Sequence, residues 1–196
     1  MTSDPHRLDR QMAFLNEADA LKGVTRHNVL MDRSRPENVA EHSWHVALWA
    51  LVLAPDMPDG CDLARAITML LIHDIVEIDA GDHPVDAAHD PHDIARKETA
   101  AAIRIFGLLP PDQAAAFRAL WDEFEANESR DARFAKSLDR FQPPNQNLAS
   151  GGGSWVDYAT TWDQFETRVA RKIAHGAPTL WDWLRPRAAA WFRTNR

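Results

Sequence analysis

The chain has 196 residues, of which 45% are hydrophobic and 26% charged, the ordinary composition of one globular domain with a sizeable core. Its formal net charge of −7 makes a long nucleic acid or an anionic membrane surface a poor general partner. The single cysteine, Cys61, excludes an intrachain disulfide, and we expect a cytoplasmic protein without a membrane-spanning segment.

Apolar spacing and helix-breaking residues predict helices along nearly the whole chain. An amphipathic helix over 8–22 ends near Gly23, and a basic loop is expected over 24–36. Further helices are predicted over 37–54 (opened by Pro36 or Glu37), 62–78, 92–106, 111–126, 130–141 (ended by Pro143 and Pro144), 160–174 and 179–192, with a loop over 79–91. No alternating strand pattern competes with these helices, so the predicted fold class is all-α.

We expect a single domain over 1–196. Its core covers about 10–175, and a C-terminal helix at about 178–192 packs on that core or on a partner. The stretch SGGGSW before residue 156 is interpreted as a flexible connection. The alternative, a phosphate-cradling loop at Gly151–Gly153, is less favoured because no Lys-Ser or Lys-Thr pair follows the glycines.

The stretch LLIHDIVEIDAGD, residues 70–82, places titratable groups at the end of an apolar segment. On one continuous helix, His73, Asp74 and Glu77 would share the face that carries Leu70 into the core. Burying two carboxylates together is costly without a compensating cation, so the pattern favours a metal site. A polar helix end followed by a solvated turn is the competing interpretation.

Two more candidate ligands lie elsewhere in the chain. His42 shares a predicted helix face with Val39 and Val46, with His45 as a rival, and Asp139 flanks an apolar stripe in FAKSLDRF. Each alone is more typical of a structural role. Together, two imidazoles and two carboxylates suit Mn²⁺, Fe²⁺, Co²⁺, Ni²⁺ or Zn²⁺ better than Ca²⁺, which prefers oxygen ligands.

Three segments resemble one known family. RPENVAEHSWHVA (35–47), LLIHDIVEIDAGDHP (70–84) and FAKSLDRFQP (134–143) are similar to the 5′-deoxynucleotidase branch of the HD-domain metal-dependent phosphohydrolases. The resemblance covers about residues 10–175. It implies an all-α HD domain, commonly a homodimer, and one divalent ion held by His42, His73, Asp74 and Asp139. It also implies a catalytic role for Glu77, a phosphate-orienting Arg26 and an acidic Asp82 at the substrate.

The chain departs from this family at two positions beside the implied site. His27 follows Arg26 where the bacterial nucleotidases have tryptophan, which leaves the preference for 2′-deoxy substrates open. His83 follows Asp82 where an aliphatic residue is usual. Both histidines are therefore candidate substrate contacts, although a histidine in a loop most often does not contact substrate.

The leading functional hypothesis is a metal-dependent phosphomonoesterase acting on nucleoside 5′-monophosphates. Alternatives are hydrolysis of another small phosphate ester or nucleotide anhydride, and a regulatory metal-binding module with little turnover. A two-metal phosphodiesterase is disfavoured because His83, His89 and His92 lack a convincing ligand spacing. The aromatic C-terminal tail, residues 162–192, could serve as core or as part of a dimer interface.

Overall fold

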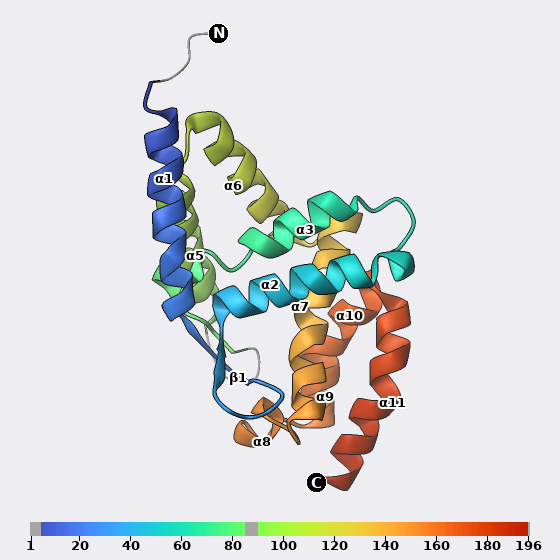
Figure 1. Ribbon diagram of the computed structural model, residues 1–196. Helices are drawn as coiled ribbons and strands as arrows, with labels where there is room; N and C mark the ends of the chain where they lie inside the picture. The colour runs from blue at the N-terminus through green and yellow to red at the C-terminus, as the bar shows by residue number, and fades with distance from the viewer. Residues whose placement is uncertain (1–4, 85–89, 196) are drawn as a thin grey trace.

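A computed structural model describes residues 5–84 and 90–195, and their fold is a bundle of helices (Figure 1). The helices are α1 (Arg7–Ala18), α2 (Val39–Val52), α3 (Leu63–Ile72), α4 (Glu77–Ala80), α5 (Pro91–Phe106), α6 (Pro111–Ala126), α7 (Arg130–Ala149), α8 (Ser154–Asp157), α9 (Trp162–Phe165), α10 (Arg171–Gly176) and α11 (Pro178–Thr194). Short 3₁₀ turns lie at Asp19–Gly23 and Ala54–Asp56, and a π-helical turn at Glu166–Ala170 joins α9 to α10. The predicted all-α class is confirmed.

A small β-hairpin interrupts the helical pattern, so the prediction of a plain loop over 24–36 was wrong. Strand β1 (Thr25–Val29) pairs antiparallel with β2 (Pro36–Asn38), with Thr25 opposite Asn38 and Val29 opposite Pro36. The strands are short and mostly polar, so they carry no alternating apolar pattern. Successive side chains of a strand point to opposite faces, which separates the direction of Arg26 from that of His27.

Helix α2 begins two residues later than predicted because Asn38 is its N-cap. The Asn38 side chain accepts a hydrogen bond from the backbone N–H of Glu41, and the Glu41 carboxylate accepts one from the backbone N–H of Asn38. This capping box fixes the first turn of the helix. The resulting register buries one face, which carries Val39, His42 and Val46 into the interior.

The predicted single helix over 62–78 is two helices separated by a turn. Asp62 caps α3 as expected, accepting from the Arg65 backbone, but the helix ends at Ile72. The next residues close tighter backbone bonds, from Glu77 N–H to the Asp74 carbonyl at 3.0 Å and from Ile75 N–H to the Ile72 carbonyl at 3.3 Å. His73 and Asp74 therefore lie in a tighter turn between the two helices, a geometry that uninterrupted apolar spacing does not reveal.

Helix α7 runs through Pro143 and Pro144, which were expected to end it. Proline removes one backbone donor and usually breaks a helix interior. Here the following turn is held from the side, because Gln146 and Asn147 are buried and hydrogen-bonded to other elements. The prolines were misread because these tertiary contacts are invisible in local sequence.

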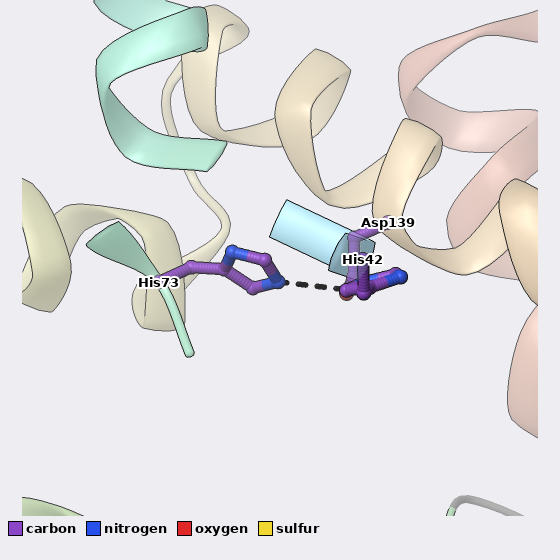
Figure 2. Close-up of side chains that lie close together, drawn as sticks. All are labelled: His42, His73 and Asp139. Carbon is purple, nitrogen blue, oxygen red and sulfur yellow. Dashed lines mark hydrogen bonds and ion pairs between the residues drawn. The ribbon is translucent and has the colours of Figure 1, made fainter. Parts of the chain in front are cut away.

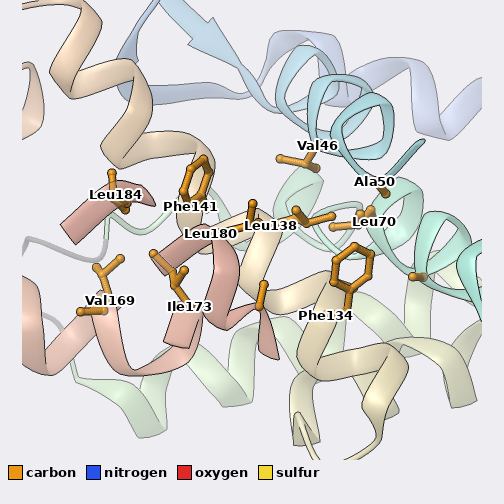
Figure 3. Close-up of a cluster of buried hydrophobic side chains, with 14 of the residues drawn as sticks. Val46, Ala50, Leu70, Phe134, Leu138, Phe141, Val169, Ile173, Leu180 and Leu184 are labelled. Atoms are coloured by element: carbon orange, nitrogen blue, oxygen red, sulfur yellow. The ribbon is translucent and has the colours of Figure 1, made fainter. Parts of the chain in front are cut away.

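Helix α7 is the axis of the larger core cluster (Figure 3). Phe134 and Leu138 pack toward α2 and α3 on one side, while Ile173 of α10 and Leu184 of α11 close the other. The aromatic tail is mostly core: Phe165 and Phe192 are buried, and α11 packs on α7 and α10. A second cluster around Phe106 joins α1, α5 and α6.

The glycine run after α7 forms a hydrogen-bonded turn and not the expected flexible connection. Gly152 donates its N–H to the Asn147 carbonyl at 2.7 Å, and the Ser154 N–H reaches the Asn147 side chain. Gly153 has φ of +44°, and a Cβ there would lie 2.4 Å from the Asn147 side-chain oxygen. The glycines thus allow a close approach of backbone to Asn147.

Among the helices of the described residues, none is long and apolar enough to cross a bilayer.

Candidate functional site

Two histidines and one aspartate from distant parts of the chain meet in the interior. His42 comes from α2, His73 follows α3, and Asp139 lies in the middle of α7. One ligand atom from each lies within 4.8 Å of the others, and all three residues are buried. Figure 2 shows the His73 imidazole pointing toward the other two side chains. We call these three residues the metal cluster.

Hydrogen bonds on the far side of each imidazole determine which nitrogen faces the metal cluster. The Nδ1 of His73 lies 2.9 Å from the Leu70 carbonyl oxygen, so it carries the proton and Nε2 faces inward. The Nδ1 of His42 lies 3.1 Å from Oε1 of Gln142, which leaves its Nε2 3.2 Å from the Asp139 carboxylate. Both inward nitrogens can then offer a lone pair to a cation.

A buried polar network behind His42 fixes the orientation of Gln142. The side-chain N–H groups of Gln142 and Gln146 both donate to Oε1 of Glu37, each at 2.9 Å. The amide nitrogen of Gln142 is thus directed to Glu37 and its oxygen to His42. Burial raises the pKa of Glu37, but the hydrogen bond and charge of His42 outweigh it, and the pKa lies below its ordinary value. We did not predict this network, although Glu37 belongs to the motif ENVAEH.

Asp74 lies beside the metal cluster and contacts both imidazoles. Its two carboxylate oxygens lie 3.1 Å from Nε2 of His73 and 3.8 Å from Nε2 of His42. Burial disfavours its charge, but the neighbouring His73 dominates, and the net effect lowers the pKa of Asp74. Asp74 also acts on His73. Burial lowers the pKa of His73, but the charges of Asp74 and Asp139 outweigh burial and raise that pKa to about 9.

This donor set fits a divalent cation. Two imidazole nitrogens and two carboxylates converge there, and the guanidinium of Arg26 contacts Asp74 from one side. The buried Nε2 of His73 makes no hydrogen bond with the described residues, although carboxylate oxygens surround it. A buried polar atom without a hydrogen bond is rare and calls for a missing partner. A transition-metal ion accepts this mixed nitrogen and oxygen ligation.

Arg26 lies among three carboxylates at the edge of the metal cluster. Its guanidinium lies 3.2 Å from Asp74, 3.7 Å from Asp82 and 3.7 Å from Glu37. Burial lowers the pKa of Arg26, but these charges, Asp74 first, raise it above its usual value. Arg26 therefore stays charged and joins the metal cluster to Asp82.

Glu77 and Asp82 complete the predicted acidic set. The carboxyl of Glu77 is buried, and burial together with the charge of Asp74 holds its pKa well above the ordinary value. Burial also raises the pKa of Asp82, against the opposing charge of Arg26. A buried acid with a raised pKa beside a metal cluster is suited to carry a proton.

A cavity of about 890 Å³ opens onto these groups and contains most of the predicted site residues. Its lining includes Arg26, His73, Asp74, Glu77, Asp82, His83 and Asp139. His42 lies behind it, fully buried. Residues that we did not predict line the other walls: Asn28, Asn147 and Ser154 on one side, and Glu98, Glu125, Lys136, Arg140 and Lys172 on the other. A cavity of this size suits a ligand as large as a nucleotide.

The other histidines are placed differently. His27 does not line the cavity: its Nε2 lies 3.1 Å from Asp157, and its ring packs on Tyr158. His45 lies outside the metal cluster, near Gln142 and Trp49, and burial lowers its pKa. His92 is exposed at the start of α5, and His89 lies outside the described residues.

Comparison with known proteins finds similarity over most of the chain. The family model described as "HD domain" matches residues 18–181. The human protein named 5′-deoxynucleotidase HDDC2 is 32% identical over 143 residues, covering 71% of this chain and 67% of the relative. A Yersinia pestis protein named 5′-deoxynucleotidase is 28% identical over 137 residues, covering 65% of this chain and 70% of its own length. The mouse HDDC2 protein is covered over 64% of its length, so the match spans about two thirds of these mammalian relatives.

Two solved structures share the fold. A predicted metal-dependent phosphohydrolase from Magnetospirillum magnetotacticum MS-1 superimposes with a TM-score of 0.90 and 44% identity, covering 95% of this chain and 96% of that one. A conserved hypothetical protein from Pyrococcus furiosus superimposes with a TM-score of 0.62 and 21% identity, covering 89% of this chain and 99% of that one. The second likeness concerns the fold alone.

Proposed function

This chain belongs to the HD domain family, and from that premise we propose that it is a metal-dependent phosphomonoesterase acting on nucleoside 5′-monophosphates. The observation that carries the proposal is the metal cluster of His42, His73 and Asp139 at the base of a nucleotide-sized cavity. Relatives named 5′-deoxynucleotidase and a structural neighbour described as a phosphohydrolase support the same chemistry.

One divalent ion is held by His42, His73, Asp74 and Asp139 in this proposal. The buried nitrogens and carboxylates favour Mn²⁺, Fe²⁺, Co²⁺, Ni²⁺ or Zn²⁺ over an ion that takes oxygen ligands only. When bound, such an ion supplies Lewis acidity that lowers the pKa of water and polarises a phosphoryl oxygen.

The remaining residues bind the substrate and move a proton. Arg26, permanently charged between Asp74 and Asp82, donates to the phosphoryl oxygens and stabilises the charge that grows on them. Glu77 holds a proton on its buried carboxyl and exchanges it with the reacting oxygens. Asp82 lies 3.7 Å from Arg26 and orients it beside the substrate. Of the two histidines expected to touch substrate, His83 lines the cavity, whereas contact by His27 stays a prediction.

A phosphate-release panel tests this function. The chelated protein is assayed with 2′-deoxy and ribonucleoside 5′-monophosphates after addition of Mn²⁺ or Co²⁺, and we expect metal-dependent release of inorganic phosphate. Nucleoside triphosphates and simple phosphate esters serve as comparison substrates within the panel. If protein that binds the metal released no phosphate from any substrate in the panel, the proposal would be overturned, and a regulatory binding module would remain.

A homodimer is the second part of the proposal. Helix α2 exposes an apolar stripe at helical spacing, with Trp44 62%, Leu51 55% and Val52 68% exposed. The aromatic tail was predicted to serve as core or as part of such an interface. Most of its rings pack on the chain's own core, with Phe165 and Phe192 buried, so the stripe on α2 is the better-placed surface. A cytoplasmic location stays a prediction.

A further inference from the structure

The phosphate of a nucleoside monophosphate is a dianion, yet the one arginine predicted to bind it is already surrounded by acids. Arg26 lies within 3.7 Å of Asp74, Asp82 and Glu37. Of the described residues that line the cavity, six carry carboxyl groups and five are lysine or arginine. Charge for a dianion must therefore come from the ion and from cations other than Arg26.

Two such cations lie on α7 and α10, which pack against each other and contribute to the cavity lining. Arg140 follows Asp139 in α7, and its Nε lies 3.5 Å from the outer oxygen of that aspartate. The guanidinium makes no hydrogen bond within residues 5–84 and 90–195, and its side chain is 23% exposed. Arg140 thus faces the cavity beside the metal cluster with donors to spare.

Lys172 of α10 completes the pair. It lines the same cavity, is accessible to solvent, and has no ion pair with any described residue. The carbonyl oxygen of Lys172 accepts a hydrogen bond from the Ser137 hydroxyl of α7 at 3.1 Å, so Lys172 and Arg140 lie on two packed helices and line the same cavity. In agreement with this placement, the positive charge of Arg140, together with burial, lowers the pKa of Lys172 to about 8. A third cation of the cavity lining, Lys136, is instead bound to Glu125 at 2.8 Å.

Two like charges side by side in a partly enclosed cavity repel each other, and an anion between them removes that cost. We propose that Arg140 and Lys172 form a phosphate clamp, which binds the phosphoryl group of the substrate together with Arg26. This inference rests on the proposed function for the identity of the ligand as a phosphate monoester. It assigns the additional positive charge that a dianion requires to α7 and α10, because the charge of Arg26 is shared with the neighbouring acids.

Binding of inorganic phosphate tests the clamp without any turnover. Phosphate is titrated into the Mn²⁺-loaded full-length protein by calorimetry, comparing wild type with Lys172→Met, Lys172→Arg and Arg171→Met. Arg171 is the matched control because it is the exposed neighbour of Lys172 on α10 and does not line the cavity. We expect Lys172→Met to raise the Kd about tenfold, the scale of one charge-assisted hydrogen bond, with Lys172→Arg near wild type and Arg171→Met unchanged.

Arg140→Met should also raise the Kd for phosphate. Since Arg140 adjoins Asp139, Mn²⁺ affinity is measured in every variant, and only phosphate binding at matched metal occupancy is compared. The clamp would be overturned if wild type and Lys172→Met bound phosphate with equal affinity, or if Arg171→Met raised the phosphate Kd as much as Lys172→Met does. A wild-type protein that binds no phosphate would overturn it as well.

The nucleotide panel separates the two proposals. If nucleotides are hydrolysed but the KM and the phosphate Kd are unchanged in Lys172→Met, the clamp is wrong and the function stands. If phosphate binding depends on Lys172 but no nucleotide is hydrolysed, the function is wrong and the anion site stands.

Discussion

Gln142 lies 3.1 Å from Nδ1 of His42 and holds that imidazole in the tautomer whose other nitrogen faces the metal cluster. Partners behind a metal-binding histidine commonly change metal affinity 10- to 100-fold when removed. We predict that Gln142→Leu weakens Mn²⁺ binding by about that factor. The measurement is a competition titration with a metal-sensitive dye.

Gln146 offers a matched control for this prediction. Its amide donates to the same Glu37 oxygen at 2.9 Å, but it makes no contact with His42. Gln146→Leu should therefore lower the free energy of unfolding by about 1 kcal/mol, the scale of one lost hydrogen bond, because Glu37 still accepts from Gln142. Its loss of metal affinity should be smaller than that of Gln142→Leu. Equal metal affinities in the two variants would show that Gln142 is structural only.

Asp74 contacts both imidazoles and Arg26, so its removal should dismantle the site at its centre. We predict that Asp74→Ala abolishes both metal loading and turnover, measured by metal analysis of the purified protein and by phosphate release. Asp79→Ala is the control, because Asp79 is an exposed acid nearby that pairs with Arg104. Full activity in Asp74→Ala would eliminate the proposed ligand set.

Glu77 is distinguished from the ligands by its raised pKa and by its place outside the metal cluster. A proton carrier of this kind typically contributes 10²- to 10⁴-fold to the rate. We predict that Glu77→Gln lowers kcat by about that factor while the affinity for Mn²⁺ changes little.

Glu98→Gln controls for the loss of any buried acid in the cavity. Burial and the charge of Glu125 raise the pKa of Glu98 to about 7, but Glu98 lies on α5, and Glu125 affects it more than Asp74 does. The kcat of Glu98→Gln should stay within about threefold of the wild-type value, a difference of less than 1 kcal/mol in activation free energy. If Glu77→Gln lost its metal as well as its activity, Glu77 would have to be reassigned as a ligand.

The metal-free protein should lose stability as the pH rises. The pKa of His73 is about 9 in the folded protein and 6.5 as its ordinary value, so its ion pairs stabilise the fold fully below pH 6.5. That contribution, up to about 3 kcal/mol, is lost as the pH passes through 9. Glu77 acts in the same direction, because its raised pKa means that the buried neutral form is lost with rising pH.

Urea unfolding of chelated protein at pH 6.5, 7.5 and 9 measures this trend. His73→Gln should show a flatter dependence over the same range, since it has no proton to lose. A stability that increases from pH 6.5 to 9 in the chelated wild type would contradict the assignment of the charged imidazole. With Mn²⁺ bound the trend should reverse, because the ion competes with the proton for His73.

Local patterning was enough to place most helices, and the family resemblance named the candidate metal residues, but neither could show how the chain turns at them. Apolar spacing carries across His73 without interruption, although the helix ends at Ile72. Pro143 and Pro144 are local breakers overridden by the buried amides of Gln146 and Asn147. In both cases tertiary hydrogen bonds and packing determine the backbone.

The parts of the site that we missed depend on contacts between distant segments, even where a residue lies inside one of the quoted motifs. Gln142 and Glu37 are 105 residues apart and meet only when α7 packs against the start of α2. Lys172 follows an ordinary amphipathic pattern, and only the cavity reveals that it faces Arg140. His27 was singled out by its neighbour Arg26, yet the alternation of a strand sends the two side chains in opposite directions.

The proposed homodimer makes a prediction about α2. Leu51 is 55% exposed and belongs to the apolar stripe, where a charge would be buried against the partner copy. Leu51→Glu should convert the dimer to a monomer, measured as mass by light scattering at micromolar concentration. Leu8→Glu on α1 is the control, since Leu8 is 63% exposed but lies outside the stripe. A wild-type protein that is already monomeric would contradict the homodimer. A dimer that persists in Leu51→Glu but dissociates in Leu8→Glu would place the interface outside the stripe.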